Sequence, residues 1–428
     1  MKVPLHVGEG VIKLAIPNEN LAGILQPKKR NPDSIDSDIL ARAVKRGQTG
    51  LTEQVPGRSV GVLLPDGTRD LPLGDIFPLL LPLLKDARKV LFFLCTGSHN
   101  SQTSANSLII STTQAQAGMA GIMEYAVISH DCQKADFYEA GVTRQGTAVL
   151  YNSLLDEVDV FVALSDVKHH YFAGYSNPIK NIVPGLCEFK TIEQNHSLTF
   201  DGRSRAGVHP WHPNASRRNN PLANDQLEAM LLVVRGRPVW ALTIISQSGG
   251  VQWADFGLAE VASSRAFQQA DDWNSHTVKP VEHMIVSPGG LPNDVDLYIA
   301  QRALELTTSV VRDGGRVLFL AACPNGIGSE LTREHFENKL TIPPEAILRQ
   351  TRKEYHLFEH KPYRFAKLIQ RLDRLWMHTQ IAPSVVRKIH AEPCTNPQVL
   401  VGSWLSDKPD TKILVVDGAN KLLLTRSI

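Results

Sequence analysis

Residues 165–196 hold six side chains that could do chemistry, three histidines and three lysines: His169, His170, His196, Lys168, Lys180 and Lys190. Asn177-Pro178 precedes Lys180 and Pro184-Gly185 follows it, and such residues prevent a long regular element. Lys180 is therefore predicted to lie on a loop or at a loop–helix junction. Binding and catalytic residues are often carried on loops held by a rigid scaffold.

Each of these side chains also has an ordinary structural interpretation. Adjacent histidines point in different directions on most backbones, so at most one of His169 and His170 is expected to face a given site. Lys180 could be a surface lysine, a phosphate ligand or a covalent anchor. His196 is predicted in the last turns of a helix that begins near Glu188, and a histidine there can bind a metal. The local spacing does not indicate a conventional three-ligand zinc site.

Two polar loops upstream follow apolar runs. Residues 65–70, PDGTRD, place Asp66 beside Arg69, which could form a loop ion pair or hold a carboxylate or phosphate. Residues 96–100, TGSHN, form a Gly-centred turn whose N–H groups suit an anion, with His99 at its tip. A lone histidine at such a position is more often incidental than catalytic.

The apolar runs before these loops predict a parallel sheet. Runs at 59–64, 88–95 and 158–164 are predicted to be buried strands, with a helix at 36–47 before the first strand and a helix at 75–87 between the first two. Gly47 is expected to end the first helix. Loops at the carboxyl ends of parallel strands converge on a ligand site, so the three polar loops should meet at one edge.

The rest of the chain predicts a second α/β domain. We expect an edge hairpin at 2–16 turning at Gly8-Glu9-Gly10, a surface excursion at 201–226 and a boundary near 273–280. Asp294 is the expected N-cap of the helix that follows. The prediction is an α/β protein of two domains, each built on a mixed or mostly parallel sheet flanked by helices, with the active site in the interdomain cleft. The domains are 1–275 and 280–405, and segment 408–428 could return to the first.

Composition indicates an ordinary globular protein. The 428 residues are 43% apolar and 21% charged, with a net charge of +2. This balance does not indicate a nucleic-acid partner or a membrane surface. Five scattered cysteines without a CxxC pair argue against a disulfide framework, and the N-terminal residues lack the apolar core of a signal peptide. A reducing, cytoplasmic location is expected.

Taken together, the motifs resemble the nickel-dependent lactate racemases and their 2-hydroxyacid racemase and epimerase homologues. The resemblance is carried in order by PDGTR, TGSH, HHYFAGYSNPIKNIVPG, TIEQNH and SPGGLPNDVDLY. It implies a nickel pincer nucleotide, which is a pyridinium mononucleotide with two thio-acid arms, bound in domain 1–275 and made by dedicated cofactor-synthesis enzymes. By position, Lys180 resembles the lysine joined covalently to one arm, and His196 resembles the histidine ligand of nickel.

The resemblance also implies a mechanism. The α-hydrogen of a 2-hydroxy acid leaves as hydride to the cofactor, and the flat 2-keto acid can take hydride back on either face. His99 and His170 resemble the two acid/base histidines, and imidazole suits both directions because its ordinary pKa is about 6.5. Arg69 resembles the arginine at the substrate site. The loops carrying these residues are expected to contact the cofactor as well, through Asp66, Thr68, Gly97 and Ser98.

The sequence departs from this family at the helix after SPGGLPND. Lactate racemases carry a Gln and a Lys there that contact the substrate carboxylate, and Ile299 and Arg302 stand at those positions. Arg302 can bind a carboxylate, whereas Ile299 cannot replace an amide donor. A bulkier or more apolar 2-hydroxy acid than lactate, or another polyol acid, is the predicted substrate.

Two other functions are compatible with the motifs. The same scaffold could serve an oxidoreductase or dehydratase, although the GxGxxG motif of a Rossmann dehydrogenase does not follow the first strand. A binding protein that has lost the chemistry is the other alternative, and Ile299 is its best support. The joint presence of Lys180, His99, His170 and His196 opposes it.

Overall fold

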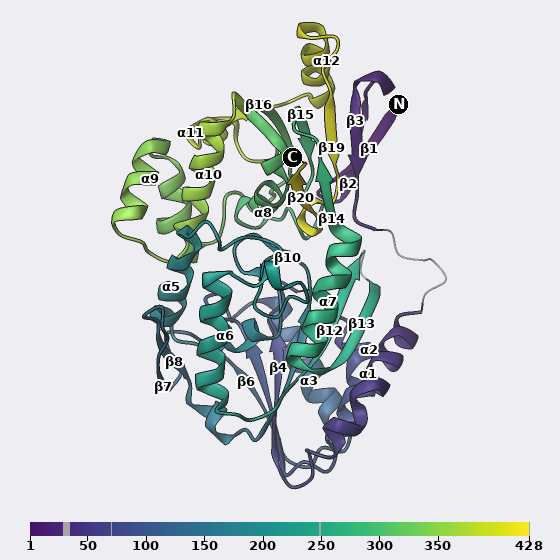
Figure 1. The fold of residues 1–428 in the computed structure, drawn as a ribbon, viewed down its shortest axis with the longest axis vertical. Helices are drawn as coiled ribbons and strands as arrows, with labels where there is room; N and C mark the ends of the chain where they lie inside the picture. Colours follow the sequence, from purple (N-terminus) through teal and green to yellow (C-terminus); the bar gives the residue numbers. More distant parts are fainter. Residues whose placement is uncertain (29–34, 70, 248–249, 428) are drawn as a thin grey trace. The chain divides into compact units, whose positions relative to one another are not determined.

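The computed structural model describes residues 1–28, 35–69, 71–247 and 250–427. The chain divides into two compact units, one of Lys29–Asp272 and one of Met1–Lys28 with Trp273–Ile428. Each has a six-stranded sheet with helices around it, so the predicted α/β class is confirmed (Figure 1). Within the described residues, no helix combines the length and apolarity that a membrane crossing needs.

The sheet of Lys29–Asp272 has the strand order β13-β12-β9-β4-β5-β6. Neighbouring strands run parallel except for β13, which is antiparallel to β12. The strands are β4 (Ser59–Pro65), β5 (Lys89–Cys95), β6 (Tyr125–Ser129), β9 (Val160–Asp166), β12 (Val239–Gln247) and β13 (Gly250–Leu258). The three strands predicted from apolar runs are β4, β5 and β9, and they lie side by side. Their apolar residues are buried almost without interruption, as expected of central parallel strands.

Helices and short hairpins complete this unit. The helices are α1 (Asp36–Thr52), α2 (Leu73–Leu80), α3 (Ser104–Met119), α4 (Ile179–Ile182), α5 (Phe189–Ser197), α6 (Pro221–Val234) and α7 (Ala259–Asn274). The hairpins are β7 (Phe137–Val142) with β8 (Ala148–Asn152), and β10 (His169–His170) with β11 (Gly174–Tyr175). Lys180 lies on the four-residue helix α4, where its Pro- and Gly-rich surroundings had predicted a loop or a loop–helix junction. Helix α5 begins after Glu188 as expected.

Two local predictions for this unit are wrong. Helix α1 continues past Gly47 to Thr52, because Gly47 serves close packing and not termination. A Cβ at Gly47 would lie 2.6 Å from Phe256, and one at Gly50 would lie 2.5 Å from Trp240. The predicted surface excursion at 201–226 is only partly on the surface: residues 213–216 are exposed, whereas its histidines and the N-cap of α6 are buried.

The sheet of the other unit has the order β18-β17-β16-β15-β19-β3, with all neighbours parallel. Its strands are β3 (Leu21–Leu25), β15 (Val281–Val286), β16 (Val311–Leu320), β17 (Arg374–His378), β18 (Glu392–Pro393) and β19 (Ile413–Val416). The helices are α8 (Leu297–Thr307), α9 (Pro344–Lys353), α10 (His360–Arg371), α11 (Pro383–Lys388) and α12 (Pro397–Asp407). Two small sheets add β1 (Lys2–Val7) with β2 (Gly10–Ala15), the predicted hairpin, and β14 (Ser275–Val278) with β20 (Leu423–Arg426).

This pairing changes the expected division of the chain. Strand β3 pairs with β19, and β19 pairs with β15, so residues 1–28 and 408–428 both belong with the C-terminal unit. The expected boundary near 273 agrees with the structure. Asp296, and not Asp294, caps α8 by accepting from the Ile299 N–H. Asp294 is buried and accepts the N–H groups of Gly8 and Ala322.

Helix α4 is fixed to the sheet by Asn181, the residue after Lys180. Its buried amide donates to the carbonyl oxygens of Leu63 in β4, at 3.0 Å, and Leu164 in β9, at 2.8 Å. One side chain thereby joins two neighbouring strands near their carboxyl ends and sets the position of Lys180.

We predict that Asn181→Ala lowers the free energy of unfolding by about 2–4 kcal/mol, because it leaves two buried carbonyls unsatisfied at about 1–3 kcal/mol each. Urea unfolding of the cofactor-free protein measures the change. Asn219→Ala, at an exposed asparagine of the same unit, is the control and should stay within about 0.5 kcal/mol of the wild type. Equal stability of the two variants would contradict the anchoring role.

Candidate active site

The predicted functional loops lie at neighbouring strand ends. Asp66 directly follows β4, and the turn containing His99 directly follows β5, the strand beside it. Strand β9, on the other side of β4, leads into β10 with His169 and His170. The sheet thus delivers all three loops to one edge, as the order of apolar runs predicted.

Asp66 and His99 form a close pair. The Asp66 Oδ2 atom lies 2.5 Å from His99 Nδ1, and Asp66 Oδ1 accepts from the Thr68 hydroxyl at 2.5 Å. Burial alone would raise the pKa of Asp66, but the charges of His99 and Arg69 and the two hydrogen bonds outweigh it and hold the pKa below its ordinary value. Asp66 is therefore a carboxylate, which keeps the proton of a neutral His99 ring on Nδ1 and leaves Nε2 able to accept one.

The loop after β5 is tied to the turn that follows Lys180. The Gly97 N–H donates to the Gly185 carbonyl at 3.0 Å, and Gly97 has a φ of 54°, a conformation that favours glycine. The His99 N–H donates to the Thr96 carbonyl at 3.0 Å. These two N–H groups are already occupied, so they are not the anion donors expected of this turn. Gly97 instead fixes the position of the loop relative to α4.

The Phe172 ring gathers three of the predicted residues. Its centroid lies 4.5 Å from that of His170 and 5.3 Å from that of His196, and Lys180 Nζ lies 5.8 Å from it. His170 also stacks on Tyr171 at 5.1 Å, and its Nδ1 accepts the Ala173 N–H at 3.3 Å. His170 and His196, which are 26 positions apart in the chain, thus share Phe172 as an aromatic neighbour.

His196 is held in an environment that keeps its ring neutral. Burial, together with the positive charges of Lys180 and His99, lowers the pKa of His196 to about 3. The adjacent Asn195 anchors α5, because its amide donates to Asp225 Oδ2 at 2.8 Å and its carbonyl oxygen accepts from Gln226 at 3.1 Å. A neutral imidazole on an anchored helix has the form that a metal ligand requires.

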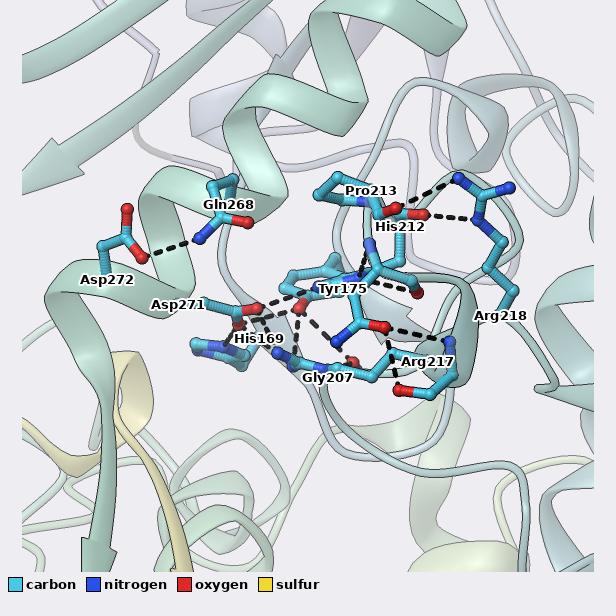
Figure 2. Close-up of polar contacts among 12 residues, drawn as sticks. His169, Tyr175, Gly207, His212, Pro213, Arg217, Arg218, Gln268, Asp271 and Asp272 are labelled. Atoms are coloured by element: carbon cyan, nitrogen blue, oxygen red, sulfur yellow. Dashed lines mark hydrogen bonds and ion pairs between the residues drawn. The ribbon is translucent and has the colours of Figure 1, made fainter.

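A buried carboxylate, Asp271 on α7, supports the hairpin that carries His170. Figure 2 shows His169, His212 and Arg217 around it. Its Oδ1 lies 2.9 Å from His169 Nε2 and 2.7 Å from the Tyr175 hydroxyl, and its Oδ2 lies 2.9 Å from His212 Nε2. Arg217 contacts both oxygens, at 2.5 and 3.2 Å.

The Asp271 cluster separates the roles of the two adjacent histidines. His169 pairs with Tyr175 in the hairpin and its side chain contacts Asp271, whereas the His170 ring contacts Tyr171 and Phe172. This agrees with the expectation that at most one of them faces a given site. Burial opposes ionisation of Asp271, but its hydrogen bonds to His169, His212 and Tyr175 keep its pKa below the ordinary value.

Sequence reasoning missed several of these residues. Arg217, His209 and His212 were not singled out, because residues 201–226 were interpreted as a surface segment, and Asp271 was not singled out either. The signal for the histidines was the HPWH motif at 209–212, in which two histidines flank Pro210 and the apolar Trp211. Of the predicted site residues, Arg302 lies in the other unit, partly buried on α8.

Comparisons with known proteins agree with the motifs. Residues 7–207 match the family model described as the lactate racemase N-terminal domain. The chain is 25% identical over 340 residues to a lactate racemase of Thermoanaerobacterium thermosaccharolyticum and 22% identical over 340 residues to one of Lactiplantibacillus plantarum. Both alignments cover 77% of this chain and 76% of the relative. Over these residues the chain is therefore similar to the lactate racemase family.

Two solved structures show the same fold. The lactate racemase apoprotein from Thermoanaerobacterium thermosaccharolyticum matches with a TM-score of 0.85 at 22% identity, over 99% of this chain and 100% of that one. A Thermotoga maritima protein from structural genomics matches with a TM-score of 0.64 at 13% identity, over 94% of this chain and 100% of that one. The fold of this chain is therefore shared along nearly its whole length.

We predict that Asp271→Ala lowers the free energy of unfolding by about 3–5 kcal/mol, because it leaves Arg217 and two histidines without their buried counter-charge. Asp272→Ala is a matched control one residue along α7, where an exposed carboxylate accepts from Gln268 at 2.7 Å. That variant should change stability by less than about 0.5 kcal/mol. Denaturant midpoints that fall equally in both would show that Asp271 has no special structural role.

Proposed function

We propose that this protein is a racemase or epimerase of a 2-hydroxy acid, which works through a nickel pincer nucleotide attached to Lys180. The observation that carries the proposal is the convergence around Phe172, where Lys180, His170 and His196 share one ring. The family relationship supports an isomerase acting on lactate-like substrates. The nickel cofactor and the hydride mechanism are the finer part of the proposal.

The residues near Lys180 fit such a cofactor. His196 offers a neutral imidazole as a nickel ligand, and Lys180 offers an amine for the covalent link. The described residues contain no group of three or more His, Cys, Asp or Glu side chains that could hold a metal ion together. Nickel at His196 would therefore take its other ligands from the nucleotide, whose thio-acid sulfurs are soft donors that suit it.

The two acid/base histidines have complementary hydrogen bonds. His99 donates from Nδ1 to Asp66, so its Nε2 can accept the proton of the substrate hydroxyl. His170 accepts at Nδ1 from the Ala173 N–H, which places the proton of the neutral ring on Nε2. When bound, the cofactor supplies the carbon that accepts and returns the substrate hydride. One histidine prepared to accept a proton and one carrying a proton suit a reaction that runs in both directions.

Substrate selection is assigned to the arginines. Arg69, beside the Asp66–His99 pair, is proposed to hold the substrate carboxylate by a bidentate contact. The carboxylate contact of Arg302 remains a prediction from the family motif. Because Ile299 replaces an amide in that motif, a substrate with a larger or more apolar side chain than lactate is proposed.

The proposal is tested with protein produced together with the cofactor-synthesis enzymes. Intact mass and nickel content should show an adduct on Lys180 and one nickel per chain, and chiral analysis should show interconversion of 2-hydroxy acid stereoisomers. His99→Ala should retain adduct and nickel but lose about 10²–10⁴-fold in rate, the usual contribution of a general acid or base. Lys180→Arg should carry no adduct.

Lys190→Ala provides the control for Lys180→Arg, because Lys190 is an exposed lysine on α5. It should carry the adduct as the wild type does. Wild-type protein with neither adduct nor nickel would overturn the cofactor assignment. Full activity of His99→Ala on every accepted substrate would overturn its proton-transfer role, and net oxidation without stereoisomer exchange would favour an oxidoreductase.

A further inference from the structure

His209 is a fully buried histidine with one occupied ring nitrogen. Its backbone N–H donates to the Arg217 carbonyl at 2.8 Å, and its Nδ1 accepts the Trp211 N–H at 3.1 Å. The ring packs on Phe267, with centroids 4.7 Å apart. Because Nδ1 accepts a hydrogen bond, the proton of the neutral ring lies on Nε2.

The Nε2–H of His209 has no hydrogen-bond partner anywhere in the described parts of the chain. Buried polar groups are almost always paired, so an orphaned donor of this kind requires an explanation. The hydrogen bond at Nδ1 and the packing on Phe267 fix the ring orientation. The orphaned donor is therefore held in one direction, as a ligand-binding group would be.

His209 lies beside the hairpin that carries His170. The Gly207 N–H donates to the Gly174 carbonyl at 3.1 Å, and a Cβ on Gly174 would lie 3.3 Å from His209 Cβ. Gly174 is the direct strand partner of His170. Any larger residue at 174 would also clash with the Val208 carbonyl, at 2.1 Å, so this close approach depends on glycine.

The electrostatic environment links His209 to Lys180. Burial, followed by the positive charges of His212 and Lys180, lowers the pKa of His209 to about 3. The ring is therefore a neutral donor across the physiological range. A fixed N–H donor that experiences the positive charge of a lysine suits an acceptor that is negatively charged.

We propose that the Nε2–H of His209 is a further cofactor-binding contact, which donates to an anionic acceptor of the mononucleotide held by Lys180. This inference rests on the proposed function. The acceptor is the phosphate or a thio-acid arm, which present the same chemistry to an N–H donor. His209 would orient the cofactor from the side of the β10–β11 hairpin, while Lys180 and His196 hold it from α4 and α5.

Two substitutions separate this role from a structural one. In His209→Asn, the side-chain oxygen can still accept the Trp211 N–H, but the donor at Nε2 is lost. In His209→Gln, the amide N–H lies near the original Nε2 position. Each variant is produced with the cofactor-synthesis enzymes and, separately, without them.

With the cofactor, we expect His209→Asn to lose nickel to a chelator about 10-fold faster than the wild type, or more, and to carry less Lys180 adduct by intact mass. His209→Gln should recover most of the retention. Without the cofactor, the melting temperature of His209→Asn should stay close to that of the wild type, because the Asn oxygen still accepts the Trp211 N–H.

Inorganic phosphate added to the cofactor-free proteins identifies the acceptor. If phosphate raises the melting temperature of the wild type but not of His209→Asn, the acceptor of the Nε2–H is the phosphate of the cofactor. If phosphate changes both melting temperatures equally, the acceptor is a thio-acid arm. Equal adduct and nickel retention in the wild type and His209→Asn would overturn this inference alone. A similar fall in melting temperature in both variants would show a structural role instead. Wild-type protein without adduct would overturn the proposed function and this inference with it.

Discussion

The candidate site depends on the neutralisation of one buried charge, that of Asp271. A carboxylate removed from water is costly unless charged or polar partners surround it. Here Arg217, two histidines and a tyrosine do so, and they come from two segments of the chain, the β10–β11 hairpin and residues 212–217. The hairpin with His170 and the segment with His209 are both held through these contacts. The positions of His170 and His209 thus follow from the need to compensate a charge on α7.

The same site shows why imidazole protonation is controlled by surroundings and not by residue type. His196 and His209 are kept neutral by burial and nearby positive charge, which lower their pKa values to about 3. His99 instead lies against a carboxylate that fixes its proton on Nδ1. One residue type therefore stands in three environments, which suit the roles of base, metal ligand and neutral donor that we propose for it. Two carboxylates supply the negative charge beside these imidazoles: Asp66 contacts His99, and Asp271 contacts His169 and His212.

Much of this arrangement was predictable from sequence because it follows local rules. Apolar runs that end in polar turns identified β4, β5 and β9, and the parallel order of these strands brought Asp66, His99 and His170 to one edge. Proline and glycine around Lys180 predicted that it would not lie on a long regular element, and α4 has only four residues. These inferences need only neighbouring residues and the general geometry of parallel sheets.

The remaining features depend on contacts between distant segments, which local patterns do not contain. Gly47 resembles a helix end, but it allows α1 to approach Phe256. Residues 201–226 are polar enough to suggest a surface, but Asp271 and the backbone of the His170 hairpin satisfy their polar groups inside the protein. The sequence of residues 413–416 predicts a strand, but it does not indicate that the partners of this strand are β15 and β3.

The pairing of β3 with β19 has a consequence for synthesis of the chain. Asn20, just before β3, donates to the Thr411 carbonyl across 391 positions of sequence. During translation, Lys29–Asp272 can fold while the C-terminal residues are still being made, since domains generally fold as units as they emerge. Strand β3 must wait until β19 leaves the ribosome. A strand made early in synthesis is thus among the last to reach its native partner.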